Sequence, residues 1–508
     1  MPLMYCHAKL KNISQHTVIS AHLFLPDYSP MNRDSFYPAI ACFPLLLMLA
    51  GCAPMHETRQ ALSQQTPAAQ VDTALPTALK NGWPDSQWWL EYHDNQLTSL
   101  INNALQNAPD MQVAEQRIQL AEAQAKAVAT QDGSQIDFSA DMERQKMSAE
   151  GLMGPFALND PAAGTTGPWY TNGTFGLTAG WHLDIWGKNR AEVTARLGTV
   201  KARAAEREQT RQLLAGSVAR LYWEWQTQAA LNTVLQQIEK EQNTIIATDR
   251  QLYQNGITSS VEGVETDINA SKTRQQLNDV AGKMKIIEAR LSALTNNQTK
   301  SLKLKPVALP KVASQLPDEL GYSLLARRAD LQAAHWYVES SLSTIDAAKA
   351  AFYPDINLMA FLQQDALHLS DLFRHSAQQM GVTAGLTLPI FDSGRLNANL
   401  DIAKAESNLS IASYNKAVVE AVNDVARAAS QVQTLAEKNQ HQAQIERDAL
   451  RVVGLAQARF NAGIIAGSRV SEARIPALRE RANGLLLQGQ WLDASIQLTG
   501  ALGGGYKR

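Results

Sequence analysis

Residues 175–185 read FGLTAGWHLDI and residues 382–390 read VTAGLTLPI, and along both stretches apolar side chains alternate with polar or small ones. A period of two places successive side chains on opposite faces of a β-strand. At about 3.3 Å per residue, each run is long enough to follow a tilted path across a membrane. The two stretches therefore predict strands with one apolar and one polar face.

Partner strands are expected just before both stretches, at about 136–147 and 355–364. Two hairpins result, with outward-facing loops over about 148–172 and 365–380. Candidates for an aromatic belt at the membrane surface are Trp169, Tyr170, Trp181 and Trp186. Soluble, half-buried hairpins are the alternative, but a hairpin that appears twice between long helical stretches favours the membrane interpretation.

Four strands cannot close a barrel by themselves, because a barrel that small has no interior for side chains. Open sheet edges are not tolerated in lipid, where no water satisfies their backbone groups. We therefore expect several chains to contribute strands to one barrel.

Most of the remaining chain predicts long helices. The stretch 189–248 contains no proline, and its apolar residues recur at heptad-like spacing. Leu214, Val218, Leu221 and Trp225 are four, three and four residues apart, and Leu231, Leu235, Ile238 and Ile245 follow. A helix of about 60 residues is about 90 Å long at 1.5 Å per residue. Such a rod needs partner helices to cover its apolar stripe.

Two sets of short segments recur at nearly the same distance. Residues 183–190 (LDIWGKNR) resemble 388–395 (LPIFDSGR) at an offset of 205, and 253–257 (YQNGI) resemble 460–464 (FNAGI) at an offset of 207. This predicts two copies of one unit, each a helix, a strand pair, a long helix, a Gly-marked break and another helix. The expected repeats are 97–300 and 318–508, joined by a proline-containing linker at 301–317.

Residues 43–52 read FPLLLMLAGC, an apolar run that ends in small residues before a cysteine. This pattern predicts a lipoprotein signal peptide over 1–51, with translation starting at Met31 rather than Met1 and an atypical extension before it. Cys52 would then carry covalent diacylglycerol and an N-acyl lipid, and 52–96 would be an extended, lipid-anchored segment. The alternative is a short buried helix that happens to end in this sequence.

Composition narrows the function classes. The chain has 508 residues, 45% of them hydrophobic, and a formal charge of −2, which gives no electrostatic reason to expect nucleic acid as a partner. Its three cysteines are Cys6, Cys42 and Cys52, so no disulfide is expected after cleavage. No later stretch reaches 18 consecutive apolar residues, so any membrane crossing is expected to use strands.

Several motifs in this order resemble the outer-membrane channel family of tripartite efflux and secretion systems, the TolC, OprM and NodT type. They are WPDSQWW at 83–89 with Asp94 and LTSLI at 97–101, ARRADLQAA at 326–334, AFYP at 351–354, and LPIFDSGR at 388–395. The resemblance covers nearly all of residues 52–508. Ala329 departs from it, since the family usually carries proline there, and we expect the change to affect only a helix start.

The resemblance implies a mainly α protein with a membrane β-barrel. Three chains of four strands would form a 12-stranded barrel in the outer membrane, continued by a periplasmic α-barrel. A periplasmic adaptor and an inner-membrane efflux pump would be its partners, with outer-membrane lipid around the barrel. It implies a passive duct for drugs and other xenobiotics, with no enzyme activity, resident cofactor or metal, gated at its periplasmic end.

Gate residues are expected after each Gly-marked break. Gly256 is followed by Glu262 at +6 and Glu265 at +9, and Gly463 by Arg469 at +6 and Glu472 at +9. In the family, acidic side chains after the break often face the axis, which makes Glu472 the first candidate. Arg469 could instead pair with Glu472 or Glu262 and latch the closed state. The alternative is that all four are solvated surface charges.

The sequence leaves three alternative functions to compare with this one. A periplasmic adaptor would need one helical hairpin between β-rich segments, whereas this chain has two hairpins. A structural envelope lipoprotein would give the strand pairs no purpose. An export-impaired, inactive family member is compatible with the unusual N-terminus.

Overall fold

The computed structural model describes residues 55, 62–64, 83–146, 169–257, 259–297, 302–311 and 326–506, with the side chains of Tyr170 and Ser260 left out. The chain divides into two units, Met1–Cys52 and Ala53–Arg508, and every element described here belongs to the second. The signal peptide, Cys52 and most of the loop at 148–172 therefore lie outside the described residues.

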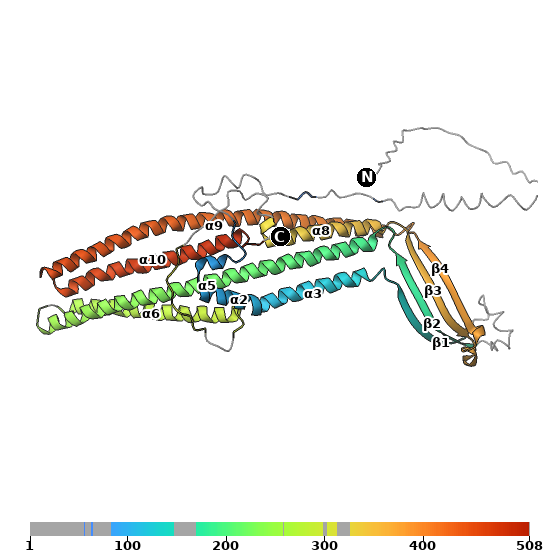
Figure 1. The fold of residues 1–508 in the computed structure, drawn as a ribbon, viewed down its shortest axis with the longest axis horizontal. Helices are drawn as coiled ribbons and strands as arrows, with labels where there is room; N and C mark the ends of the chain where they lie inside the picture. The colour runs from blue at the N-terminus through green and yellow to red at the C-terminus, as the bar shows by residue number, and fades with distance from the viewer. Residues whose placement is uncertain are drawn as a thin grey trace, which may run out of the picture. The chain divides into compact units, whose positions relative to one another are not determined.

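Long helices dominate the second unit (Figure 1). In chain order the elements are η2 (Trp88–Tyr92), α2 (Asn95–Asn107), α3 (Pro109–Ala129), β1 (Gln135–Lys146), β2 (Trp169–Leu183), α5 (Lys188–Gln254), α6 (Ser260–Leu294), α8 (Ala329–Ala350), β3 (Asp355–Ala366), η4 (Leu369–Asp371), η5 (His375–Ala377), β4 (Gln378–Thr387), α9 (Arg395–Asn461) and α10 (Gly467–Ala501). The mainly helical class with a small antiparallel sheet is thus confirmed.

Helices α5 and α9 organise the packing. Each has 67 residues and is therefore about 100 Å long at 1.5 Å per residue. Helix α5 ends at Gln254, six residues beyond the end of the predicted stretch 189–248. Helix α8 packs between them on the half nearer the strands, and α10 packs between them on the other half. Helices α3 and α6 cover the other side of α5.

The order of the elements recurs, and the two pairs of long helices recur at one constant offset. Helices α5 and α9 begin at Lys188 and Arg395, and the 35-residue helices α6 and α10 begin at Ser260 and Gly467, in both cases 207 residues apart. The offset of 205 taken from the first motif was therefore wrong by two. It equated Gly187 with Asp392, whereas Gly187 and Gly394 are the equivalent left-handed residues before the long helices.

The four strands form one antiparallel sheet in the order β1-β2-β3-β4. Both predicted hairpins are confirmed, and β2 also pairs with β3. Strands β2 and β4 begin earlier than predicted, at Trp169 and Gln378, so 169–172 and 378–380 belong to strands and not to the predicted loops. Both strands also end earlier than predicted, at Leu183 and Thr387. Asp184 instead accepts hydrogen bonds from the first amides of α5, and Pro389 has no amide hydrogen for a sheet ladder.

The tryptophan motif near residue 83 secures the N-terminal segment to α5. Trp88 and Trp89 are buried in a core that includes Trp223 and Trp225 of α5. Asp94 caps α2 by accepting from the Leu97 amide, and its other oxygen accepts from the Tyr222 hydroxyl at 2.7 Å. Part of the predicted extended segment is thus a 3-10 helix, η2.

The glycine tail closes the same region. α10 ends at Ala501, and Gly505 follows with a φ of 81°. A Cβ at Gly505 would overlap the carbonyl oxygen of Asp85, so only glycine fits against the N-terminal segment. Nearby, the Arg327 guanidinium lies 4.9 Å from the Trp83 ring centre.

Within the described part of the chain, no helix is both long enough and apolar enough to cross a membrane. The linker residues 302–311 adopt neither helix nor strand. Lys305 exchanges hydrogen bonds with the Gln96 side chain, and Val307 donates to Gln226, so this linker is held against α2 and α5.

Candidate functional site

The sheet has two chemically different faces, and the strand register sorts them. Leu177 of β2 lies between Phe138 of β1 and Leu362 of β3, which in turn lies beside Met380 of β4. The apolar residues of this face, here called the apolar face, are Ile136, Phe138, Ala140, Met142, Phe175, Leu177, Ala179, Trp181, Leu183, Ile356, Leu358, Ala360, Leu362, Met380, Val382, Ala384 and Leu386. In the single chain this face is open, with Phe138 67% and Val382 80% exposed.

The opposite face, here called the polar face, is formed mainly by charged, amide, hydroxyl and glycine residues. It carries Asp137, Ser139, Asp141, Glu143, Asn172, Thr174, Gly176, Thr178, His182, Asn357, Gln363, Asp365, Gln379 and Thr383. Met359 and Phe361 are its apolar members, and the Phe361 ring packs over Gly381. The alternation predicted from the sequence is therefore present in all four strands.

Exposed aromatic residues lie at both ends of the sheet. Trp169 is 52% exposed at the loop end, and Trp181 is 49% exposed toward the helix end. Just beyond β2, Trp186 stacks on Tyr353 with ring centres 5.0 Å apart and donates to the Pro354 carbonyl. This arrangement suits an aromatic belt at a membrane surface, while the side chain of Tyr170 lies outside the described residues.

Helices α5 and α6 form one helical hairpin, and α9 and α10 form a second. The tips of these two helical hairpins have the same backbone structure. Helix α5 ends before Gly256 and α9 before Gly463, with φ values of 72° and 71°. In each tip the residue after the glycine donates back to a helix carbonyl at 2.9 Å, Ile257 to Leu252 and Ile464 to Arg459. These left-handed caps reverse the chain and start α6 and α10 at equivalent points.

The structure brings three of the four predicted gate residues together. Arg469 donates to Glu472 on its own helix at 2.7 Å, and these side chains are 68% and 40% exposed. The hydrogen bond to Glu472 raises the pKa of Arg469, and the charges of Glu472, Asp249 and Glu262 raise it further. Arg469 thus pairs directly with Glu472, with Glu262 of α6 nearby, whereas no hydrogen bond or ion pair joins Glu265 to another described residue.

One ion pair near the tips, which joins the α9–α10 hairpin to the α5–α6 hairpin, was not predicted from the sequence. Arg474 of α10 donates to Glu241 of α5 at 3.3 Å and to Gln457 of α9 at 3.2 Å. Elsewhere, Arg274 pairs with Glu239 within the first hairpin and Arg481 with Glu446 within the second. Counting residues from the glycine break could not find Arg474, because its partner lies 233 residues away in α5.

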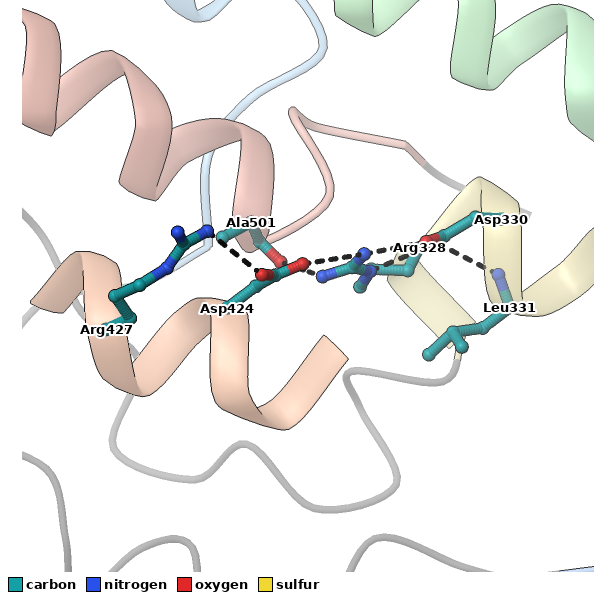
Figure 2. Close-up of polar contacts among 6 residues, drawn as sticks. All are labelled: Arg328, Asp330, Leu331, Asp424, Arg427 and Ala501. Atoms are coloured by element: carbon teal, nitrogen blue, oxygen red, sulfur yellow. Dashed lines mark hydrogen bonds and ion pairs between the residues drawn. The ribbon is translucent and has the colours of Figure 1, made fainter. Parts of the chain in front are cut away.

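Where α8 begins and α10 ends, the ARRADLQAA motif forms a charged junction (Figure 2). Arg328 donates to both carboxylate oxygens of Asp330, at 3.0 and 2.6 Å, and to the Ala501 carbonyl at the end of α10. Asp424 of α9 lies 3.8 Å from Arg328 and also pairs with Arg427 at 3.2 Å. The junction therefore fixes α8, α9 and α10 to one another.

Ala329 occupies the first helical position of α8 and is buried. Proline is favoured at that position because the first amides of a helix have no intrahelical partner. The departure at Ala329 therefore falls at a helix start, as the resemblance predicted.

A polar cavity of about 690 Å³ lies between α5, α9 and α10. Its walls carry an ion pair, Arg220 with Asp493, together with Glu224, Gln431 and Lys438. No group of three or more histidine, cysteine or acidic residues in the described ranges could hold a metal ion.

The comparisons with known proteins agree with this architecture. The family model for outer membrane efflux proteins matches residues 100–297 and 320–504. The multidrug resistance outer membrane protein MdtQ of Escherichia coli O157:H7 is 99% identical over 478 residues, which cover 94% of this chain and all of MdtQ. MdtP of Shigella flexneri, a multidrug resistance outer membrane protein, is 36% identical over 91% of this chain and 94% of its own length.

Among solved structures, the outer membrane protein VceC of Vibrio cholerae superposes with a TM-score of 0.72 at 26% identity, covering 84% of this chain and all of VceC. Family-model matches over most of the chain and relatives this similar place the helices in the periplasm and the protein in the outer membrane. The chain therefore belongs to the outer membrane efflux protein family.

Proposed function

We propose that this protein is the outer-membrane duct of a tripartite export system for drugs and other xenobiotics. Three copies form a 12-stranded barrel, continued by a periplasmic helical tube that is gated at its lower end. The duct is passive, because an inner-membrane pump and a periplasmic adaptor supply energy and select the cargo. The names of MdtQ and MdtP, which describe multidrug resistance, support the class of cargo.

The two-faced sheet with two open edges carries this proposal. Its apolar face suits lipid and its polar face suits a water-filled interior. Strands β1 and β4 each pair with one neighbour, so both edges present unpaired backbone groups. In lipid each unpaired group costs several kcal/mol, and pairing with other chains removes that cost.

The direction of the edge strands permits closure. Successive strands in the order β1-β2-β3-β4 are antiparallel, so β1 and β4 run in opposite directions. The β4 edge of one copy can thus pair antiparallel with the β1 edge of the next. Three copies give an even-stranded barrel with an interior, which four strands cannot provide.

Lipid on the N-terminal cysteine attaches the mature protein to the membrane in this proposal. Cleavage after the signal peptide 1–51 leaves Cys52 to carry the diacylglycerol and N-acyl lipid, with no other cofactor. Incorporation of labelled palmitate, lost in Cys52→Ala, tests this step. A parent protein without label would exclude the anchor while leaving the barrel intact.

At the periplasmic end, Glu472, Arg469, Glu262 and Glu265 form the gate. The contact between Arg469 and Glu472 supports this role, because three copies would place alternating charges around one axis. A ring of acidic side chains attracts cations, and Arg469 offsets that attraction. The near-identical tips, 207 residues apart, also favour the duplication of one ancestral unit.

The mass of the detergent-extracted protein, from light scattering with the detergent subtracted, tests the assembly. Three chains per particle are expected. A stable monomer would leave the sheet edges open and favour a structural envelope lipoprotein. A trimer without conductance in planar bilayers would indicate an inactive member of the family.

Ion selectivity tests the gate. We expect Glu472→Ala to lower and Arg469→Ala to raise the preference for cations, measured as the reversal potential in a salt gradient. Parent-like selectivity and conductance in both variants would exclude these residues from the gate without affecting the trimer.

A further inference from the structure

Two cations interrupt the apolar face at one end. Among the residues that share this face on β1, Ile136, Phe138, Ala140 and Met142 are followed by Arg144 and Lys146. Their cross-strand partners on β2 are Thr171 and Trp169. Both cationic side chains belong to exposed residues.

The acidic residues of the sheet lie on the other face. Asp137, Asp141 and Glu143 of β1 alternate with the apolar positions, and Asp355 and Asp365 of β3 share their face. Among the residues that pair across the described sheet, Arg144 and Lys146 are therefore the only charges on the apolar face. A charge on a lipid-facing surface costs about 2–4 kcal/mol at the membrane midplane and much less at its edge. Their place at a strand end fits the edge.

That end lies away from the helices (Figure 1). Residues 147–168 and 367–377 connect the strands there, and the helices join the sheet at the opposite end. Since the helices are periplasmic, Arg144 and Lys146 lie toward the outer leaflet.

The loop between β3 and β4 continues the apolar face at the same end. Phe373 packs against Phe175 with ring centres 5.6 Å apart, and Leu372 lies over Gly173. Phe373 remains 84% exposed and Leu369 50% exposed, which suits contact with acyl chains. The loop's arginine, Arg374, already pairs with Asp371 at 3.2 Å.

We propose that Arg144 and Lys146 bind the phosphate groups of an outer-leaflet glycolipid whose acyl chains cover the apolar face. Side chains two residues apart on one strand face are about 7 Å apart, close enough to engage one headgroup together. Arginine and lysine both form charge-assisted hydrogen bonds with phosphate oxygens. The inference rests on the proposed function in one respect, that the apolar face contacts lipid.

Native mass spectrometry of the detergent-extracted protein tests the site. Bis-phosphorylated lipid A is titrated in one series and its dephosphorylated form in another. We expect the parent to prefer the phosphorylated lipid and Arg144→Gln/Lys146→Gln to lose about tenfold in affinity for it, equivalent to one charge-assisted contact. Arg144→Lys/Lys146→Arg keeps both charges and should recover most of the binding. Arg374→Gln is the matched control and should bind like the parent.

Three results would overturn the site: equal binding of both lipids, an equal loss in Arg374→Gln, or displacement of the lipid by excess inorganic phosphate. The last would indicate a general anion site. Oligomeric mass and conductance are measured on the same variants. If these remain parent-like while lipid discrimination is absent, this inference fails and the proposed channel stands. The single variants Arg144→Gln and Lys146→Gln serve if the double variant does not assemble.

Discussion

Arg474 of α10 reaches across to Glu241 of α5, with 3.3 Å between guanidinium and carboxylate. Arg474 also donates to Gln457 of α9, so one side chain of α10 contacts two other helices. Since α5 belongs to the first hairpin and α10 to the second, separation of the hairpins must break this pair.

In the proposed gated channel, Glu241→Gln should therefore raise the fraction of time spent open. Glu241 is 18% exposed and Arg474 is 43% exposed, so we assign the pair about 0.5–1 kcal/mol, or a twofold to fivefold rise in the open fraction. Single-channel recordings in planar bilayers measure that fraction. Arg274→Gln is the control, because Arg274 pairs with Glu239 inside the first hairpin. An equal effect of both variants would show that any lost surface pair loosens the helices.

A positive charge on the apolar face should prevent stable insertion. Val382→Arg places arginine on the apolar face, which contacts lipid in the proposed barrel, and should cost about 2–4 kcal/mol per chain. Thr383→Arg, one residue further on the polar face, should be tolerated. The measurement is the amount of protein recovered from outer-membrane extracts, and equal yields of the two variants would contradict the proposed orientation of the sheet.

Loss of Arg328 should destabilise the helical part. Its side chain is only 12% exposed, and Arg328→Ala leaves Asp330, Asp424 and the Ala501 carbonyl without this donor. Breaking such a pair costs on the order of 3 kcal/mol. Arg427→Ala, which removes a 71% exposed partner of Asp424, should cost at most about 1 kcal/mol. Denaturant unfolding of the extracted protein measures the midpoint of each variant. Similar midpoints for Arg328→Ala and Arg427→Ala would show that the Arg328 junction contributes no more stability than an exposed ion pair.

Alkaline pH should weaken the contact between α8 and α5. Burial, and then the hydrogen bond to Glu206, raises the pKa of Tyr337 from 10.0 to about 12. The neutral phenol therefore stabilises the fold fully below pH 10, and this contribution is lost as the pH rises toward 12. Melting temperatures across this range should fall less steeply in Tyr337→Phe than in the parent. Tyr253→Phe, at an exposed hairpin position, should follow the parent curve.

Local patterns made most of the fold predictable. Proline-free stretches predicted α5, and alternation predicted the strands, because helix and strand periods are properties of neighbouring residues. The end of β2 was not predictable from the alternation, because Asp184 caps helix α5. That role depends on the residues after Asp184 and not on the strand pattern before it. The contact of Arg469 with Glu472 was within reach of the sequence, because residues three apart on a helix are neighbours.

The contact of Arg474 with Glu241 was out of reach for a physical reason. It depends on the alignment of α10 along α5, which is set by the packing of side chains along both helices and not by residues close together in the sequence. The charged junction at Arg328 is similar: its motif is visible in the sequence, but its carbonyl partner at Ala501 lies 173 residues away.

The fit of Gly505 against Asp85 joins the last residues of the chain to the first helices. Asp85 is synthesised long before Gly505. The contact between them therefore cannot form until residues 85–505 have all been synthesised and Gly505 has left the ribosome, so it is a late step in folding. A fusion partner is therefore better attached after Tyr506 than inserted within the glycine turn.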